Sequence, residues 1–203
     1  MSTAKSIRRY INMLPADKIF STREVLQFGS RASVDQSMYR LVFDEKIVRL
    51  AYGVFIKKTK GMKIPSIYEI AVAKANAFDK VLFMHGQDAA FELAIEKSPN
   101  KKTIFYVPGS ASSSFLCHIQ QHRVHTKATA ARRVYAGNTR VGKAIRALWE
   151  LGPSKIDASV LKKASLNLNR EEIRTFRLAA HRVPYWLARF TNYAATLAGE
   201  ALH

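Results

Sequence analysis

The sequence predicts an α+β protein in which an N-terminal winged helix-turn-helix precedes a mixed α/β domain with a helical C-terminal region. Three observations predict this fold. Capped helices and a strand–turn–strand pattern follow one another in the first 63 residues. A basic, proline-containing segment comes next. Residues 64–203 then mix strand-like and helix-like patterns, and the pattern is helical from about residue 139.

The first helix is predicted by its apolar spacing. Ile7, Tyr10, Ile11 and Leu14 recur at i, i+3, i+4 and i+7, which places them on one face of a helix over residues 5–14. Pro15 ends that helix. The apolar pair at residues 19–20 then predicts a brief strand or a hydrophobic staple.

A capping box marks the start of a second helix. In the segment from Ser21 to Glu24, the serine hydroxyl can accept from the glutamate amide, and the carboxylate can reach back. Gly29 ends this short helix, and Ser30 offers a second N-cap at once. Two helices joined by a tight glycine-containing turn are typical of a helix-turn-helix. The apolar positions of the next helix, from residue 31 to about 44, are Val34, Met38, Leu41 and Val42.

A hairpin and a linker follow. Two β-rich runs, residues 47–50 and 54–57, surround a turn that contains Gly53, and they predict the wing. Lysines, a glycine and Pro65 then form a basic segment, so we place the domain boundary between 1–63 and 64–203. The second domain is predicted to contain helices at 66–78 and 87–95, strands at 81–83 and 103–107, a polar loop at 110–114, two short strands within 123–135, and helices at 141–151, 158–166, 170–182 and 185–197.

The charge balance favours a polyanionic partner. Thirty-three Lys and Arg against 15 Asp and Glu leave a formal +18, of which +8 lies before residue 64 and +10 after it. Charged residues interrupt every apolar run, so we expect no membrane span, and the start of the sequence lacks a signal-peptide pattern. A single cysteine, Cys117, suits a reducing cytoplasm.

The predicted helix-turn-helix supplies a mechanism for DNA binding. The second helix of such a motif enters the major groove, where Arg pairs with guanine and Gln with adenine. Residues before that helix and on the wing would contact the phosphates. The candidate DNA-binding residues are Thr22, Arg23, Arg31, Ser33, Gln36, Ser37, Arg40, Arg49, Tyr52, Lys57 and Lys58. The alternative is an ordinary solvated helix face.

The histidines carry weaker patterns. His118, His122 and His125 lie near Cys117, but no carboxylate lies close enough in sequence to complete a metal site. We therefore expect no metal and no cofactor. His85 follows a strand and precedes a glycine, but with no paired acid in view it is predicted only to start a helix.

Several segments resemble the AbiEi-like antitoxins of type IV toxin–antitoxin systems. They are VDQSMYRLVFDEKIVRLAYGVFIK (34–57), KVLFMHGQDAAFELAI (80–95) and GKAIRALWELG (142–152). The sequence departs from the family pattern at Glu45-Lys46, where a glycine is usual. The resemblance implies a repressor that binds inverted repeats in its own promoter. It also implies an antitoxin that counters a nucleotidyltransferase-like toxin without a stable complex.

Two other classes of function stay open. The basic residues of the second domain suit an RNA-binding or ribosome-associated protein. A nuclease or nucleotidyltransferase would need clustered carboxylates to hold a divalent metal. The acids of this chain are scattered along the sequence, so we expect no enzyme activity.

Overall fold

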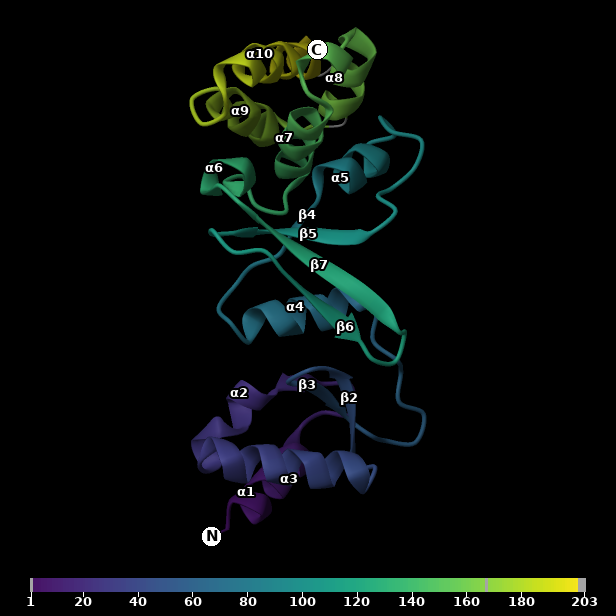
Figure 1. The fold of residues 1–203 in the computed structure, drawn as a ribbon. Coiled ribbons are helices and arrows are strands. Elements are labelled where there is room, and N and C mark those ends of the chain that lie inside the picture. Colours follow the sequence, from purple (N-terminus) through teal and green to yellow (C-terminus); the bar gives the residue numbers. More distant parts are fainter. Residues whose placement is uncertain (1, 167, 201–203) are drawn as a thin grey trace. The chain divides into compact units, whose positions relative to one another are not determined.

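The computed structural model describes residues 2–166 and 168–200 and shows a mixed α+β protein whose C-terminal part is helical (Figure 1). The chain divides into two compact units. Unit 1 comprises the chain up to Leu82 together with Ser114–Val124, and unit 2 comprises Phe83–Ser113 and the chain from His125 onward.

Unit 1 contains a three-stranded antiparallel sheet in the order β1-β3-β2. Phe20 of β1 lies opposite Phe55 of β3, and Val48 of β2 lies opposite Ile56. The predicted helices, the brief first strand and the hairpin are confirmed. The elements are α1 (Thr3–Met13), β1 (Ile19–Ser21), α2 (Thr22–Val25) with a 3-10 turn (Leu26–Phe28), α3 (Arg31–Phe43), β2 (Ile47–Ala51), β3 (Val54–Lys57) and α4 (Ile67–Asn76).

Local hydrogen bonds fix the starts of α2 and α3 as the sequence predicts. The Ser21 amide donates to Glu24 Oε1 at 2.7 Å, and the Ser33 amide donates to Ser30 Oγ at 3.3 Å. The Tyr10 hydroxyl donates to the other Glu24 oxygen at 2.9 Å, which ties α1 to the start of α2. Burial and this carboxylate raise the pKa of Tyr10 to about 12.

The apolar faces of α1 and α3 meet in one core with the sheet. Burial of these side chains, at about 25 cal/mol per Å² of apolar surface, holds the short helices in place. The buried members are Ile7, Ile11, Phe20, Val25, Val34, Met38, Leu41, Ile47 and Phe55.

The hairpin turn and the turn from α3 to β2 both use the left-handed backbone region. Gly53 has φ 75° in the hairpin turn, and Glu45 has φ 53° in the turn from α3 to β2. At Glu45, where the AbiEi-like pattern has a glycine, this chain has a glutamate whose backbone adopts the conformation that glycine favours. An ion pair of 2.6 Å between the carboxylate of Glu45 and Lys58 Nζ holds this side chain.

The expected domain boundary after residue 63 falls inside unit 1. Helix α4 buries Ile70 and Ala71 and packs on the strands of unit 1. The tip of the β6–β7 hairpin also belongs to this unit, since the His118 amide donates to the Leu50 carbonyl at 2.7 Å. A basic linker-like composition at 57–65 does not reveal these later attachments.

Unit 2 combines strands with a set of helices. The second sheet has the order β4-β5-β7-β6; β4 and β5 belong to unit 2, whereas Ser114–Cys117 of β6 and His122–Val124 of β7 belong to unit 1. The prediction of two short strands within 123–135 is wrong: one strand, β7, is followed by helix α6, whose Ala-Arg-Arg-Val sequence favours a helical turn. The elements are β4 (Phe83–Met84), α5 (Gly86–Glu92), β5 (Thr103–Pro108), β6 (Ser113–Cys117), β7 (His122–Thr129), α6 (Ala131–Val134), α7 (Arg140–Leu151) with a 3-10 turn (Pro153–Lys155), α8 (Ala158–Ser165), α9 (Arg170–Ala179) and α10 (Tyr185–Glu200).

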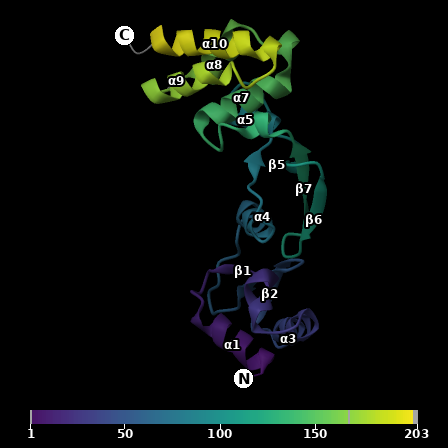
Figure 2. The ribbon, with the colours of Figure 1, turned by 90° about the vertical axis from the view of Figure 1, so that its left-hand side faces the viewer.

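Helices α7 to α10 enclose an apolar core that includes Leu148, Phe176 and Leu187. Figure 2 shows α9 and α10 packed alongside each other. Asp157 and Asn169 cap α8 and α9, as predicted. Within the described ranges, no helix is long and apolar enough to cross a membrane.

Candidate nucleic-acid interface

Helix α3 turns a polar and aromatic face to solvent. Its core side carries Val34, Met38 and Leu41, and the opposite side carries two large aromatic side chains that sequence reasoning did not select, Tyr39 and Phe43, which are 63% and 77% exposed. The full set of exposed residues on α3 is Arg31, Ala32, Asp35, Gln36, Tyr39, Arg40 and Phe43.

Among the predicted residues on α3, Gln36 and Arg40 are exposed and have no hydrogen-bond or ion-pair partner within the described chain. Ser33 is half-buried, and its hydroxyl lies 2.9 Å from Ser30 Oγ. Ser37 does not lie on the outer face as expected. It is buried, and its hydroxyl donates to the Ser33 carbonyl at 2.8 Å, because it lies three residues after Val34 and shares the core face.

The N-terminus of α3 lies beside the hairpin turn. The Arg31 guanidinium pairs with Asp35 at 2.7 Å, which raises the pKa of Arg31, and Tyr52 of the turn adds to that shift. Tyr52 is itself 68% exposed. The structure therefore brings together two predicted residues that lie 21 positions apart in the sequence.

The predicted residues at the start of α2 have structural partners. Thr22 is buried, and its amide donates to the Gly53 carbonyl at 2.9 Å. The exposed Arg23 pairs with Asp79 at 2.6 Å and donates to the Ala77 carbonyl at 3.2 Å. Thr22 is therefore held away from solvent by its burial, and Arg23 would have to give up contacts within unit 1 to approach a phosphate.

The basic residues of the hairpin are also partly engaged. Arg49 lies over the Phe55 ring at 5.6 Å, and its Nε is buried without a hydrogen-bond partner. Lys57 donates to the Asn12 carbonyl at 3.0 Å. Lys58 pairs with Glu45. Phosphate contacts by these lysines would exchange one partner for another.

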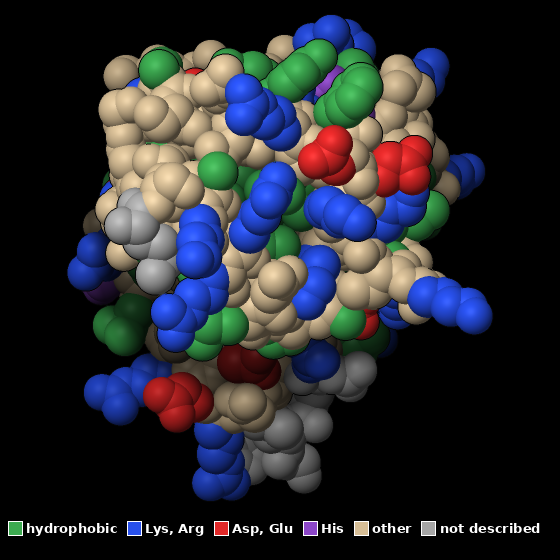
Figure 3. Space-filling model, turned by 90° about the horizontal axis from the view of Figure 1, so that it is seen from below, with side chains coloured by type: hydrophobic (Ala, Val, Ile, Leu, Met, Phe, Trp, Pro, Cys, Tyr) green, Lys and Arg blue, Asp and Glu red, His purple; other side chains and the backbone are tan. Residues whose placement is uncertain are grey.

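Helix α1 adds cations that the sequence analysis did not count. Lys5, Arg8 and Arg9 are exposed at i, i+3 and i+4, opposite the buried Ile7 and Ile11. A helical wheel of residues 5–14 would have revealed them. Figure 3 shows Lys and Arg side chains distributed across one face of the molecule. Next to α1 is a hollow lined by Arg8, Ile11, Asn12, Leu41, Asp44, Lys46, Lys57 and Lys58.

The net charge divides evenly between the units. Unit 1 carries 16 Lys and Arg against 7 Asp and Glu, a formal +9, and unit 2 carries 17 against 8, also +9. Unit 1 therefore accounts for only half of the net positive charge of the chain.

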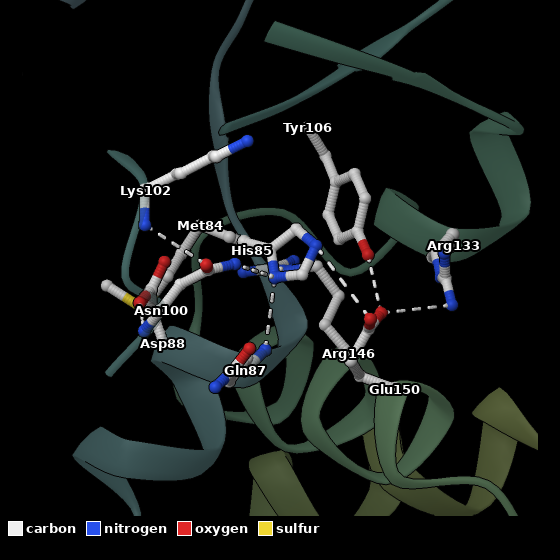
Figure 4. Close-up of polar contacts among 10 residues, drawn as sticks. All are labelled: Met84, His85, Gln87, Asp88, Asn100, Lys102, Tyr106, Arg133, Arg146 and Glu150. Carbon is white, nitrogen blue, oxygen red and sulfur yellow. Dashed lines mark hydrogen bonds and ion pairs between the residues drawn. The ribbon is translucent and has the colours of Figure 1, made fainter. Parts of the chain in front are cut away.

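A polar cluster around the buried His85 lies in unit 2 (Figure 4). His85 is 4% exposed and stacks on the Tyr106 ring at 4.6 Å. Its Nδ1 accepts from the Gln87 amide at 3.3 Å, so the neutral ring carries its proton on Nε2. That nitrogen lies 3.8 Å from Glu150 Oε1. Burial is the main cause that lowers the pKa of His85.

Glu150 is the centre of this cluster. The Tyr106 hydroxyl donates to its Oε2 at 2.7 Å, and Arg133 approaches the same oxygen at 3.4 Å. Burial raises the pKa of Tyr106. His85 does start a helix as predicted, but it has an acid neighbour that lies 65 positions away in the sequence. The cluster joins β5, α5, α6 and α7 at one carboxylate.

The cysteine and histidine cluster does not form a metal site in the structure. Cys117 is fully buried at the end of β6, and burial raises its thiol pKa. Within the described residues, no three His, Cys, Asp or Glu side chains are grouped so that they could hold a metal ion.

The chain belongs to a family of unknown function, DUF6088, whose model matches residues 6–176. The match covers unit 1 and unit 2 up to α9. No curated protein matches the chain.

Proposed function

We propose that unit 1 is a winged helix-turn-helix and that the chain is a DNA-binding transcriptional autoregulator. The observation that carries this proposal is the exposed face of α3, whose capped N-terminus lies beside Tyr52 of the β2–β3 turn. The sheet order β1-β3-β2 agrees with a winged arrangement, in which β2 and β3 follow the recognition helix. Lys5, Arg8 and Arg9 of α1 add positive charge for backbone contacts.

The exposed residues of α3 suit base recognition. Gln36 can pair bidentately with adenine, and Arg31 can pair with guanine once it leaves Asp35. Asp35 itself can accept from cytosine N4. Arg31 must leave Asp35 in order to bind a base, and only the correct base replaces the hydrogen bonds of the broken ion pair. The Arg31–Asp35 pair therefore makes binding selective.

Gel shifts of the whole chain with its own upstream DNA test the proposal. We expect that DNA to bind at least about 10³-fold more tightly than unrelated duplex. Arg31→Ala and Gln36→Ala should each cost about 1–3 kcal/mol on the operator and little on unrelated DNA. Equal affinity for both duplexes would exclude a sequence-specific regulator.

A charge-matched pair of variants tests the placement of α3. Asp35→Asn removes a negative charge next to the proposed DNA and should tighten binding to unrelated duplex. Asp17→Asn makes the same charge change at an exposed position outside α3 and should have little effect. If the two variants behave alike, α3 does not face DNA.

We further propose that the chain acts as the antitoxin against a co-encoded nucleotidyltransferase-like toxin. This role rests on the resemblance to AbiEi-like antitoxins, and unit 2 offers a separate body to perform it. Co-expression with the neighbouring toxin gene in cells should restore growth. It should do so equally well with Arg31→Ala, if unit 1 serves only repression. Failure of the unaltered chain to restore growth would refute the antitoxin role.

A further inference from the structure

Helix α9 carries a line of exposed arginines. Arg170, Arg174 and Arg177 recur at i, i+4 and i+7 and are all exposed. At 3.6 residues per turn they fall within about 60° of one another around the helix. The opposite face is apolar and buried in the core of unit 2, through Ile173, Phe176 and Ala179.

Helix α10 carries two exposed tyrosines and an exposed arginine, whose guanidinium lies over the Phe190 ring at 4.7 Å. Tyr185, Arg189 and Tyr193 recur at i, i+4 and i+8, so neighbouring side chains are about 6 Å apart along the axis. Tyr185 is 95% exposed and Tyr193 is 51% exposed. Among the exposed large apolar and aromatic side chains of the described chain, Tyr185 has the highest exposed fraction.

The two lines of side chains belong to neighbouring helices of one body. Helices α9 and α10 pack together (Figure 2). The Arg177 guanidinium lies against the last turn of α10, 3.7 Å from the position that a Cβ on Gly199 would take. We call the exposed residues Arg170, Arg174, Arg177, Tyr185, Arg189 and Tyr193 the α9–α10 face.

The positive charge of this face is not balanced within the described chain. Residues 173–199 contain no Asp or Glu. Over residues 2–166 and 168–199, Arg170, Arg174, Arg177 and Arg189 have no ion-pair partner. Unit 1 differs in this respect, because Arg23 and Arg31 are paired with acids.

We propose that the α9–α10 face binds an unpaired nucleic-acid strand. Unpaired strands are bound by cations that follow the backbone and by aromatic rings on which bases stack. This face offers both side-chain types at regular spacing. A duplex keeps its bases stacked inside, so it cannot use the exposed rings of Tyr185 and Tyr193. The inference goes beyond the duplex binding proposed for unit 1, since it concerns other residues and another ligand.

A protein partner fits this face less well. Protein interfaces are depleted of charge at their centres, whereas this face has arginines at its centre and no acid between residues 173 and 199. A partner would have to supply several carboxylates at once. A phosphodiester backbone supplies one charge per nucleotide.

Fluorescence anisotropy of the whole chain tests the proposal with labelled oligouridylate and oligothymidylate of about 15 nucleotides. The double variant Arg170→Gln/Arg174→Gln should weaken binding at least about tenfold at low salt and reduce the slope of log K against log salt by about 1.4. Tyr185→Ala and Tyr193→Ala should each weaken binding by about 5- to 150-fold and leave that slope unchanged.

Matched controls separate this site from net charge and from unit 1. Lys101→Gln/Lys102→Gln removes the same charge from another exposed part of unit 2 and should change affinity less than threefold. Arg31→Ala should keep strand binding. If the lysine control matches the arginine variant, or if the tyrosine variants bind normally, the proposal is wrong.

A competition experiment and two comparisons with the assays of the proposed function complete the test. A duplex of the same length should compete poorly with oligouridylate, and equal competition would overturn the requirement for unpaired bases. If operator binding fails but strand binding still depends on this face, the duplex proposal is refuted and this one stands. If the tyrosine variants abolish toxin neutralisation but bind oligouridylate normally, the face is a protein interface instead.

Discussion

Replacement of the buried Arg146 should destabilise unit 2 severely. The side chain is 0% exposed, and burial lowers its pKa to about 10, so it stays charged at neutral pH. Its Nε donates to the Met84 carbonyl at 2.9 Å, and one terminal nitrogen donates to the Gly137 carbonyl at 2.7 Å. Within the described chain no carboxylate pairs with it. Arg146 therefore satisfies buried backbone acceptors from two separate segments.

The magnitude follows from these two acceptors. Arg146→Met keeps most of the volume and removes the cost of a buried charge, but it leaves the Met84 and Gly137 carbonyls without this donor. An orphaned buried acceptor costs about 1–3 kcal/mol. After the gain from burying an apolar chain is subtracted, we expect a net loss of about 2–4 kcal/mol. Arg146→Ala should lose more, because it also leaves a cavity.

Urea unfolding followed by tryptophan fluorescence measures this effect in the right unit, since Trp149 and Trp186 both belong to unit 2. Arg174→Met is the control: it makes the same chemical change at an exposed site and should stay within about 0.5 kcal/mol of the unaltered chain. If Arg146→Met is as stable as the unaltered chain, the arginine is not required to satisfy these carbonyls, and the reasoning fails.

Three further predictions concern local features. Burial lowers the pKa of His85 in the folded chain, so the unfolded chain binds the proton more tightly. The free energy of unfolding should therefore fall as the pH drops below about 6.5. His85→Asn keeps an acceptor at the helix start and should flatten this pH dependence in urea titrations. Ala94 has φ 54°, so Ala94→Gly should raise the free energy of unfolding by about 1 kcal/mol. The control Ala32→Gly in α3 should lower the free energy of unfolding by about as much. If both variants change the free energy of unfolding in the same direction, the backbone argument is contradicted. Ser30→Ala removes the N-cap of α3 and should cost about 1 kcal/mol in thermal or urea unfolding.

Local signals predicted most of unit 1. The caps at Ser21 and Ser30 and the hairpin around Gly53 involve neighbours within three or four positions, so the sequence displays both partners together. The position of Ser37 failed for a related reason. Serine is a polar residue type, so Ser37 was predicted to face solvent. The helical period places it against the core instead, where its hydroxyl donates a hydrogen bond to the Ser33 carbonyl of the preceding turn.

Long-range pairing explains what could not be predicted in unit 2. Glu150 lies in the last turn of α7, and only the approach of α5 to α7 places it beside His85. That approach is close: a Cβ on Gly86 would lie 2.5 Å from the Arg146 carbonyl oxygen and from Glu150 Cβ. No local sequence pattern predicts that Gly86 and Glu150 are neighbours, so the cluster can be recognised only in the three-dimensional structure.

Several cations of unit 1 are paired with acids, whereas those of the α9–α10 face are not paired with any described acid, and this difference has a measurable consequence. In unit 1, Arg23, Arg31 and Lys58 must each leave an acid to contact a phosphate. Each such exchange releases fewer counterions than a free cation would, so the proposed duplex binding should depend on salt less steeply than the number of contacting cations implies. Over residues 2–166 and 168–199 the arginines of the α9–α10 face pair with no acid. Strand binding there should therefore show nearly the full slope of about 0.7 per contact. If the slope of log K against log salt per contact is the same for duplex and for strand, the ion pairs of Arg23, Arg31 and Lys58 do not persist in solution.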